Sequence, residues 1–224
     1  MGQPIIKENI STSRRFAGVI SWLLMFSGTA LIAISVFYLA YTRQAQAQLK
    51  NIETTQSNIA EPAFMVPVPQ YQNLLPNTAP DAQWITIPSI RVDSKTVELG
   101  TKLDNNGVLV WETPNHAVGH HKGTANPGEA GNVVMSGHIS SPVRGEGNVF
   151  HRLPEIAVGD EVVVITPLGR FHYEVIQKKV VLPDEISVMD PTPEPVLTLI
   201  TCVPDLVYSH RLIDTTKPVK VDPL

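Results

Sequence analysis

The chain has 224 residues, 43% of them apolar, and a formal net charge of −4 at pH 7, which is enough for one domain of ordinary size with extensions. The weak negative charge excludes a nucleic-acid partner held by broad electrostatic attraction. The single cysteine excludes an internal disulfide and a metal site built from several thiolates.

The N-terminal region has the pattern of a membrane anchor. Residues 1–15 are polar and include three Lys and Arg residues, and residues 16–41 follow without a charge. As a helix this run would be about 39 Å long, against a hydrocarbon core of about 30 Å. We therefore predict a cytoplasmic segment (1–15) and a transmembrane signal anchor (16–41), with the folded domain on the extracellular side of the cell membrane. A signal peptide cleaved near Ala47 is the alternative.

Residues 42–83 are rich in Gln, Asn, Thr and Pro, which predicts an extracellular linker that becomes an extended, proline-rich spacer. Its one apolar island is Phe64 to Val68. This island either docks on the folded domain or stays exposed, and the pattern leaves open whether residues 64–72 form a lid.

Residues 84–224 form the predicted folded domain, and their pattern is all-β. Short runs rich in β-branched and aromatic residues alternate with turn residues, and no run keeps a helical period beyond about two turns. About eight closely spaced strands favour a closed barrel, because closure leaves no exposed edge. We also expect a short helix at residues 148–153. The predicted strands are Trp84–Ile87, Val97–Leu99, Val108–Trp111, Val133–Ser136, Val162–Thr166, Phe171–Leu182, Val196–Thr201 and Val207–Ile213.

The only cysteine, Cys202, lies at the end of a predicted strand. Pro204 stops the apolar run soon after it, so the thiol can be reached. On this strand Cys202 shares one face with Thr198 and Ile200, and the residues between them take the other face. The next run is expected to return as the second strand of a hairpin. A lone cysteine on a strand is as often an inert small apolar residue, so its position alone does not establish a nucleophile.

A nucleophilic thiol requires a proton acceptor and a donor for the oxyanion. The chain has 7 histidines, and His138 stands out because it follows a predicted strand and the flexible Gly137. His210 and Arg211 lie on opposite faces of the returning strand, so only one of them can readily join Cys202. A permanently charged guanidinium is the better oxyanion donor, which favours Arg211, although alternation alone does not decide between the two.

Several stretches of the folded domain carry motifs in a fixed order. TLITC ends at Cys202 and is followed by HRLI, with Arg211 nine residues after the cysteine. Upstream, GEAGNVVMSGHISSP contains His138 and precedes VFHRLPEIAVGDEVVV, and the domain opens on WITIPSIRVDSKTVELG. Together these stretches, which cover nearly all of residues 84–214, resemble sortases, the membrane-anchored cysteine transpeptidases of bacteria.

This resemblance implies a closed eight-stranded β-barrel of the sortase type, in which the Cys202 strand forms the floor of a peptide groove. It matches His138, Cys202 and Arg211 to the family's catalytic residues, and Thr201 to a threonine that helps to shape the groove. Residues 182–195 match the loop that often sets the choice of sorting motif. Some sortases bind Ca²⁺ near such a loop, but the spacing of its acidic residues here favours a solvated loop, and we expect no cofactor.

The function implied by the resemblance is transpeptidation. Sortases cut a secreted protein at a C-terminal sorting motif of the Leu-Pro-x-Thr-Gly type, hold the upstream part as a thioester, and pass it to an amine. We therefore expect three partners: sorting-motif peptides, an amine of a cell-wall precursor or a pilin, and the membrane through the N-terminal helix. The alternatives are a catalytically silent, membrane-tethered β-barrel binding or scaffolding protein, and a cysteine-dependent cell-wall crosslinking enzyme of another fold.

A second group of histidines, His116, His120 and His121, has Glu112 and Glu129 nearby, a composition that metal ligands can have. The Pro and Gly residues around this group predict a loop, and no helical or hairpin spacing brings the rings together. We therefore expect a loop that rims the groove and no metal ion there.

Overall fold

The structure is a computed structural model that describes residues 30–51, 81–103, 109–112, 114–141 and 146–223. Residues 30–51 form one helix, and the residues from Trp84 onward contain all the described strands. The predicted apolar island and possible lid in the linker lie outside the described residues.

The N-terminal helix corrects the predicted location of the chain. Its apolar part ends at Tyr41, after which it continues through glutamines and charged residues. The described apolar part is about 18 Å long at 1.5 Å per residue, shorter than a hydrocarbon core of about 30 Å. Among the described residues no helix is long and apolar enough to cross a membrane. This finding contradicts the predicted single-pass membrane location; residues 16–29 of the predicted span lie outside the described residues.

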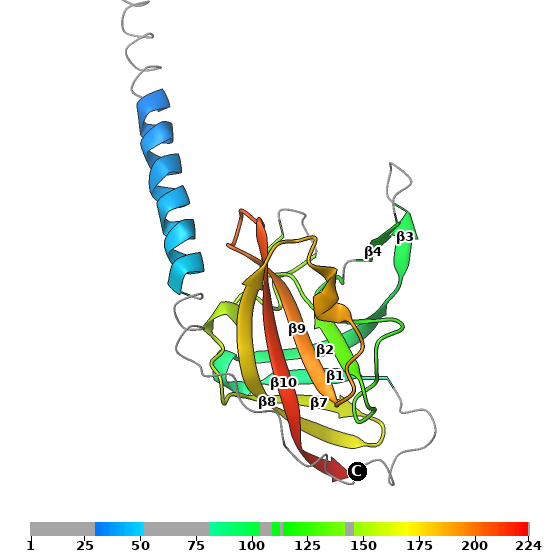
Figure 1. The fold of residues 1–224 in the computed structure, drawn as a ribbon. Helices are drawn as coiled ribbons and strands as arrows, with labels where there is room; N and C mark the ends of the chain where they lie inside the picture. Colours follow the sequence, from blue (N-terminus) through cyan, green and yellow to red (C-terminus); the bar gives the residue numbers. More distant parts are fainter. Residues whose placement is uncertain (1–29, 52–80, 104–108, 113, 142–145, 224) are drawn as a thin grey trace, which may run out of the picture. The chain divides into compact units, whose positions relative to one another are not determined.

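Eight strands form a closed barrel, as predicted, in the order β1-β2-β5-β6-β9-β10-β8-β7 (Figure 1). The pairing of β7 with β1 closes it, and β3 and β4 form a separate two-stranded sheet. The elements are β1 (Trp84–Ile87), η2 (Pro88–Ile90), β2 (Val92–Leu99), β3 (Thr101–Leu103), β4 (Leu109–Trp111), β5 (Val118–His121), β6 (Asn132–Ser136), η3 (Leu153–Glu155), β7 (Glu161–Thr166), β8 (Gly169–Val181), η4 (Ile186–Met189), β9 (Val196–Val203) and β10 (His210–Pro223), where η marks a 3-10 helical turn.

Two parallel pairings decide where the connections of this barrel lie. β2 pairs with β5 and β6 pairs with β9 in parallel, whereas the pairs of β9 with β10 and of β10 with β8 are antiparallel. A parallel pair needs a long crossover connection, and the one between β6 and β9 contains β7 and β8. Because β6 and β9 are parallel, the turns that follow them lie at the same end of the barrel.

The structure differs from the predicted elements at several places. β2 begins at Val92 instead of Val97, β10 begins at His210 instead of Val207, and β3 was not predicted. Residues Val118–His121, predicted to be a loop, form β5. Gly119 is required there for close packing, since a Cβ atom would lie 2.0 Å from Cδ1 of Leu99 on the neighbouring strand. β10 continues to Pro223 because its C-terminal part still pairs with β8. The expected helix at 148–153 is replaced by turns and the single 3-10 turn η3.

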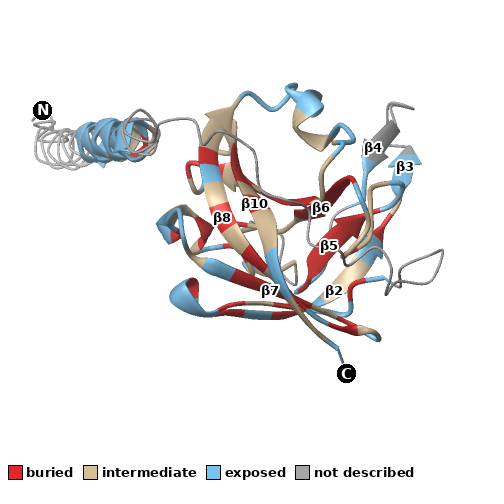
Figure 2. Ribbon diagram, turned by 60° about the horizontal axis from the view of Figure 1, so that its bottom comes forward, coloured by how far each residue is buried: buried red, intermediate tan, exposed pale blue. Residues whose placement is uncertain are grey.

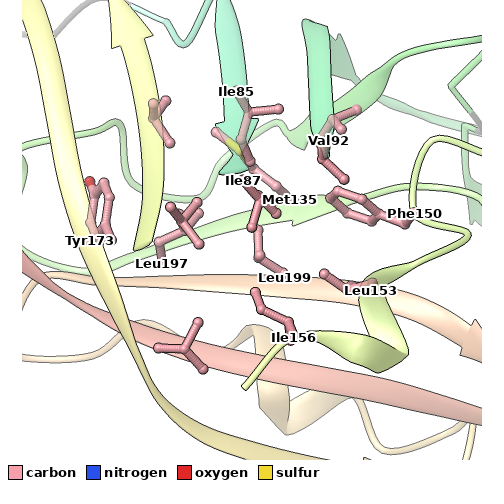
Figure 3. Close-up of a cluster of buried hydrophobic side chains, with 14 of the residues drawn as sticks. Ile85, Ile87, Val92, Met135, Phe150, Leu153, Ile156, Tyr173, Leu197 and Leu199 are labelled. Atoms are coloured by element: carbon pink, nitrogen blue, oxygen red, sulfur yellow. The ribbon is translucent and has the colours of Figure 1, made fainter. Parts of the chain in front are cut away.

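The apolar core fills the barrel. Figure 3 shows side chains from β1, β6, β8 and β9 meeting Phe150 and Leu153, which come from the connection after β6. Leu197 and Leu199 of β9 are fully buried, and burying one leucine contributes roughly 1.5–3 kcal/mol. These two residues fix the inward face of β9, so the predicted alternation leaves Cys202 on the outward face. Figure 2 shows the same concentration of buried residues in the barrel strands.

Candidate active site

The floor of the candidate site is the hairpin of β9 and β10. Cys202 and Arg211 lie directly opposite each other in the antiparallel register of these strands, so their side chains leave the same face of the sheet. Cys202 is a free thiol of intermediate exposure. His210 takes the other face, where its Nδ1 lies 2.9 Å from Oγ of Ser209. The fold therefore brings Arg211, and not His210, next to the cysteine.

His138 reaches this floor through the parallel pairing of β6 with β9. Ser136 is opposite Ile200 in that register, and the backbone N–H of Gly137 donates to the carbonyl oxygen of Ile200 at 3.1 Å. His138 and Cys202 each lie two residues beyond this pair. The two residues therefore meet at the same end of two hydrogen-bonded strands.

Gly137 and Thr201 fix the backbone that precedes His138. A Cβ atom on Gly137 would lie 2.7 Å from Cγ1 of Val149 and 2.8 Å from Cδ2 of Phe150, so no larger residue fits without movement. The hydroxyl of Thr201 donates to the carbonyl oxygen of Gly137 at 2.8 Å. Thr201 is buried, so its side chain shapes the groove by holding this backbone.

A groove of about 300 Å³ brings the four predicted site residues together. Its lining comes from the β9 and β10 floor, from the turn after β6 with the residues that follow β4, and from segment 182–195. The lining combines charged and polar groups with apolar surface, as peptide and ligand sites commonly do. The apolar lining residues are Trp111, Ile186, Val188, Met189, Ile200 and Ile213.

The thiol of Cys202 rests in its neutral form. Burial raises the pKa of Cys202, and the positive charge of Arg211 lowers it by a smaller amount. Because an isolated thiol already titrates above neutral pH, the net effect leaves little thiolate at pH 7. Any attack by this residue therefore requires that the thiol proton be taken up by a neighbouring base.

Hydrogen bonds to the backbone hold the guanidinium of Arg211 in place and leave some of its N–H donors available. Its Nη1 donates to the carbonyl oxygens of Tyr208 at 3.2 Å and His210 at 3.1 Å. Within the described residues, Nε and Nη2 of Arg211 make no hydrogen bond. A guanidinium has five N–H donors, so those that remain can bind a carbonyl oxygen in the groove.

Glu146 lies beside His138, a contact that the sequence analysis did not predict. Its Oε2 is 3.7 Å from Nε2 of His138, and the two side chains are 28% and 18% exposed. Nε2 is buried and has no hydrogen bond to any described residue, while Glu146 also accepts a hydrogen bond from Ser141. The sequence gives no signal for this contact, because no motif or periodicity links the two positions.

A polar contact joins the turn after His138 to the turn between β9 and β10. Oγ of Ser140 lies 2.8 Å from the hydroxyl of Tyr208, and Ser140 also donates to the carboxylate of Asp205. The backbone carbonyl of Tyr208 is one of the two that accept a hydrogen bond from Arg211. The turn that carries His138 and the turn that precedes the strand of Arg211 are therefore tied together by side chains.

Two residues of the second histidine group, His120 and His121, lie on strand β5 and not in a loop. His121 lies on β5, where its Nε2 is 2.8 Å from Oγ of Ser136 and its ring packs against Trp111 with the centroids 4.6 Å apart. Burial lowers the pKa of His121 to about 4, so it is a neutral polar group in the groove lining. Among the described residues, no group of three or more His, Cys, Asp and Glu side chains could hold a metal ion.

The fold and the groove define a class of protein, a closed all-β barrel with one thiol, an arginine and a histidine at a peptide-sized groove. The sequence profile of the sortase domain matches residues 85–219. The match covers more than half of the chain, and the chain therefore belongs to the sortase family, whose members are cysteine transpeptidases.

Individual relatives come from several sortase subclasses. Sortase D of Bacillus subtilis strain 168 is 32% identical over 130 residues, which cover 58% of this chain and 58% of that protein; the match thus spans less than two thirds of this relative. Sortase C-1 from Actinomyces oris is 28% identical, with a TM-score of 0.50 and coverage of 80% of this chain and 99% of that chain. The lid mutant of sortase A from Corynebacterium diphtheriae is 25% identical, with a TM-score of 0.52 and coverage of 81% and 97%.

Proposed function

We propose that this chain is a transpeptidase that cleaves a sorting motif of the Leu-Pro-x-Thr-Gly type and joins the upstream part to an amine. The observation that carries the proposal is the placement of Cys202 opposite Arg211 on the floor of a groove that His138 also lines. Membership of the sortase family supports the reaction class. The sorting motif and the amine of a cell-wall precursor or pilin rest on the likeness to the family.

The first half of the proposed reaction forms a thioester. Sγ of Cys202 attacks the carbonyl carbon of the threonine in the motif while His138 takes the thiol proton. This order suits a thiol that is neutral at rest. The free donors of Arg211 stabilise the oxyanion, and His138 then gives its proton to the departing glycine amine as the carbon–nitrogen bond breaks.

The second half reverses these roles. The acceptor amine attacks the thioester carbonyl, His138 takes a proton from the amine, and the thiolate of Cys202 leaves and is protonated again. Because Nε2 of His138 is buried next to Glu146, we assign the proton exchange to Nδ1. Glu146 occupies the Nε2 side of the ring, with its Oε2 3.7 Å from that nitrogen.

The test uses the full chain with a fluorescent Leu-Pro-x-Thr-Gly peptide and an amine acceptor, and the products are read by mass. The wild type should form the ligated product. C202A should form none, and a methanethiosulfonate reagent, which can react only with Cys202, should abolish turnover. Labelled protein that keeps full activity would overturn the proposal.

A matched pair of variants separates the enzyme from a silent binding protein of the same fold. R211A should lose turnover, by about 100-fold for a lost oxyanion donor. H210A changes the neighbouring residue on the opposite face and should keep turnover. If the wild type and both variants bind the peptide equally and none of them turns it over, the result would favour the silent binding protein.

A further inference from the structure

Segment 182–195, between β8 and β9, contributes apolar side chains to the groove but has little burial of its own. Ile186, Val188 and Met189 line the groove. No residue of the segment is buried, and Ile186 is 73% exposed. Figure 2 draws it in the colours of exposed and intermediate residues. Packing alone therefore gives this segment little free energy to hold one position.

A buried asparagine attaches this segment to the barrel. Nδ2 of Asn132, on β6, donates to the carbonyl oxygens of Val188 at 3.1 Å and Asp190 at 3.2 Å. Its Oδ1 accepts a hydrogen bond from the hydroxyl of Thr198, on β9, at 2.7 Å. The orientation of the amide follows from chemistry, because the two carbonyl oxygens can only accept. Asn132 is 4% exposed and Thr198 3%, so water does not compete for these bonds.

The remaining hydrogen bonds of the segment do not reach the barrel. Among the described residues, those of residues 182–195 stay within the segment, as in Asp190 to Ser187 and Thr192 to Glu194. Its four prolines (Pro183, Pro191, Pro193 and Pro195) restrict the backbone locally but attach it to nothing. In the described part of the chain, the hydrogen bonds that cross from the barrel to this segment thus come from one side chain.

We propose that Asn132, held by Thr198, is a positioning residue that fixes segment 182–195 at the groove and thereby sets how tightly the enzyme binds its peptide. This inference rests on the proposed function, since it assumes that the groove receives the sorting peptide. Without Asn132, two carbonyl oxygens lose their donors and the segment samples positions in which Val188 and Met189 no longer line the groove. The reacting residues are untouched, so the loss falls on peptide binding.

Amide hydrogen exchange of the full chain tests the attachment without any substrate. N132A should speed exchange in residues 182–195 by about tenfold or more, as expected for the loss of one or two hydrogen bonds. N132D keeps the volume of the side chain but replaces the donating amide nitrogen with an oxygen that can only accept from its position opposite two carbonyl oxygens. It should speed exchange at least as strongly. T198V should have a smaller effect. T216V is the matched control, because Thr216 is equally buried but donates to Leu197 within the barrel wall, at 3.0 Å.

Cleavage kinetics test the consequence for binding. N132A should raise KM for the fluorescent sorting peptide about tenfold and leave kcat within about twofold, because only uniform binding is lost. T216V should change neither constant. Equal exchange in the wild type, N132A and N132D overturns the attachment, and faster exchange with an unchanged KM overturns the effect on binding. A wild type that cleaves no sorting peptide refutes the proposed function instead, while the exchange experiment still decides whether Asn132 holds the segment.

Discussion

Two opposing effects act on the thiol of Cys202, and their balance is testable at the scale of single residues. Burial raises the pKa of Cys202, and Arg211 lowers it by less. Removing the charge in R211A should therefore raise the pKa further, and alkylation of Cys202 by iodoacetamide near pH 8 should slow by about threefold to tenfold. R211K should keep most of the wild-type rate. The rate is measured over a range of pH by mass spectrometry, and an unchanged pH profile in R211A would show that the guanidinium does not act on the thiol.

Gly137 places His138 by having no side chain. In G137A the added methyl group must displace Phe150, which is fully buried, or the backbone that carries His138. We expect a loss of about 1–3 kcal/mol in the free energy of unfolding and a fall in turnover of at least about tenfold. G123A is the control, because a Cβ atom on Gly123 meets nothing within 4 Å and only its φ of +84° is strained. Turnover in G137A equal to that of G123A would contradict this role.

At the scale of elements, the turn between β9 and β10 is coupled to the turn after β6 by Tyr208. Y208F removes the hydroxyl that lies 2.8 Å from Ser140 and leaves the carbonyl that binds Arg211. The loss of one hydrogen bond, about 1 kcal/mol, should lower turnover about fivefold, since of these two contacts only the one between Ser140 and Asp205 then ties the turns. S209A alters an exposed hydroxyl in the same turn and should have no effect. Equal turnover in the two variants would mean that the hydroxyl contact does not position the site.

The hairpin of β9 and β10 could be predicted because its information is local. Alternation along residues 196–203 assigns Leu197 and Leu199 to the core and Cys202 to the open face, and the structure has this arrangement. Alternation alone did not decide between Arg211 and His210. That choice needed either the resemblance to the family or the cross-strand register, which is set by the geometry of the turn.

Other features are invisible in the sequence because they depend on contacts between distant segments. β5 was missed because Gly119, a residue typical of loops, serves to accommodate the side chain of Leu99. Glu146 contacts His138 with no regular spacing between them, and Asn132 binds carbonyl oxygens 56 and 58 residues further along the chain. Neither periodicity nor a motif encodes such contacts. The membrane location failed for a different reason, since no helix in the described part of the chain is long and apolar enough to cross a membrane.

At the scale of the whole barrel, a buried ionisable pair links stability to pH. Asp214 of β10 and Lys178 of β8 are directly opposite each other in the strand register and are 0% and 6% exposed. Nζ of Lys178 donates to the carbonyl oxygens of Pro154 at 2.6 Å and Ile156 at 2.9 Å. Neither carboxyl oxygen of Asp214 has a hydrogen bond to a described residue. Burial raises the pKa of Asp214 to about 8, against a smaller opposite effect of Lys178.

This pair predicts that the barrel becomes less stable as the pH rises toward 8. Between the ordinary pKa of 3.8 and about 8, the folded state keeps a proton that the unfolded state has lost. The free energy of unfolding therefore falls with rising pH, by up to about 1.4 kcal/mol per pH unit. D214N cannot ionise, so it should remove this slope, match the wild type at low pH and exceed its stability near pH 8, as measured by urea unfolding across that range. A variant less stable than the wild type near pH 8, with the same slope, would instead mean that Asp214 is ionised and that its attraction to Lys178 outweighs the cost of burying both charges.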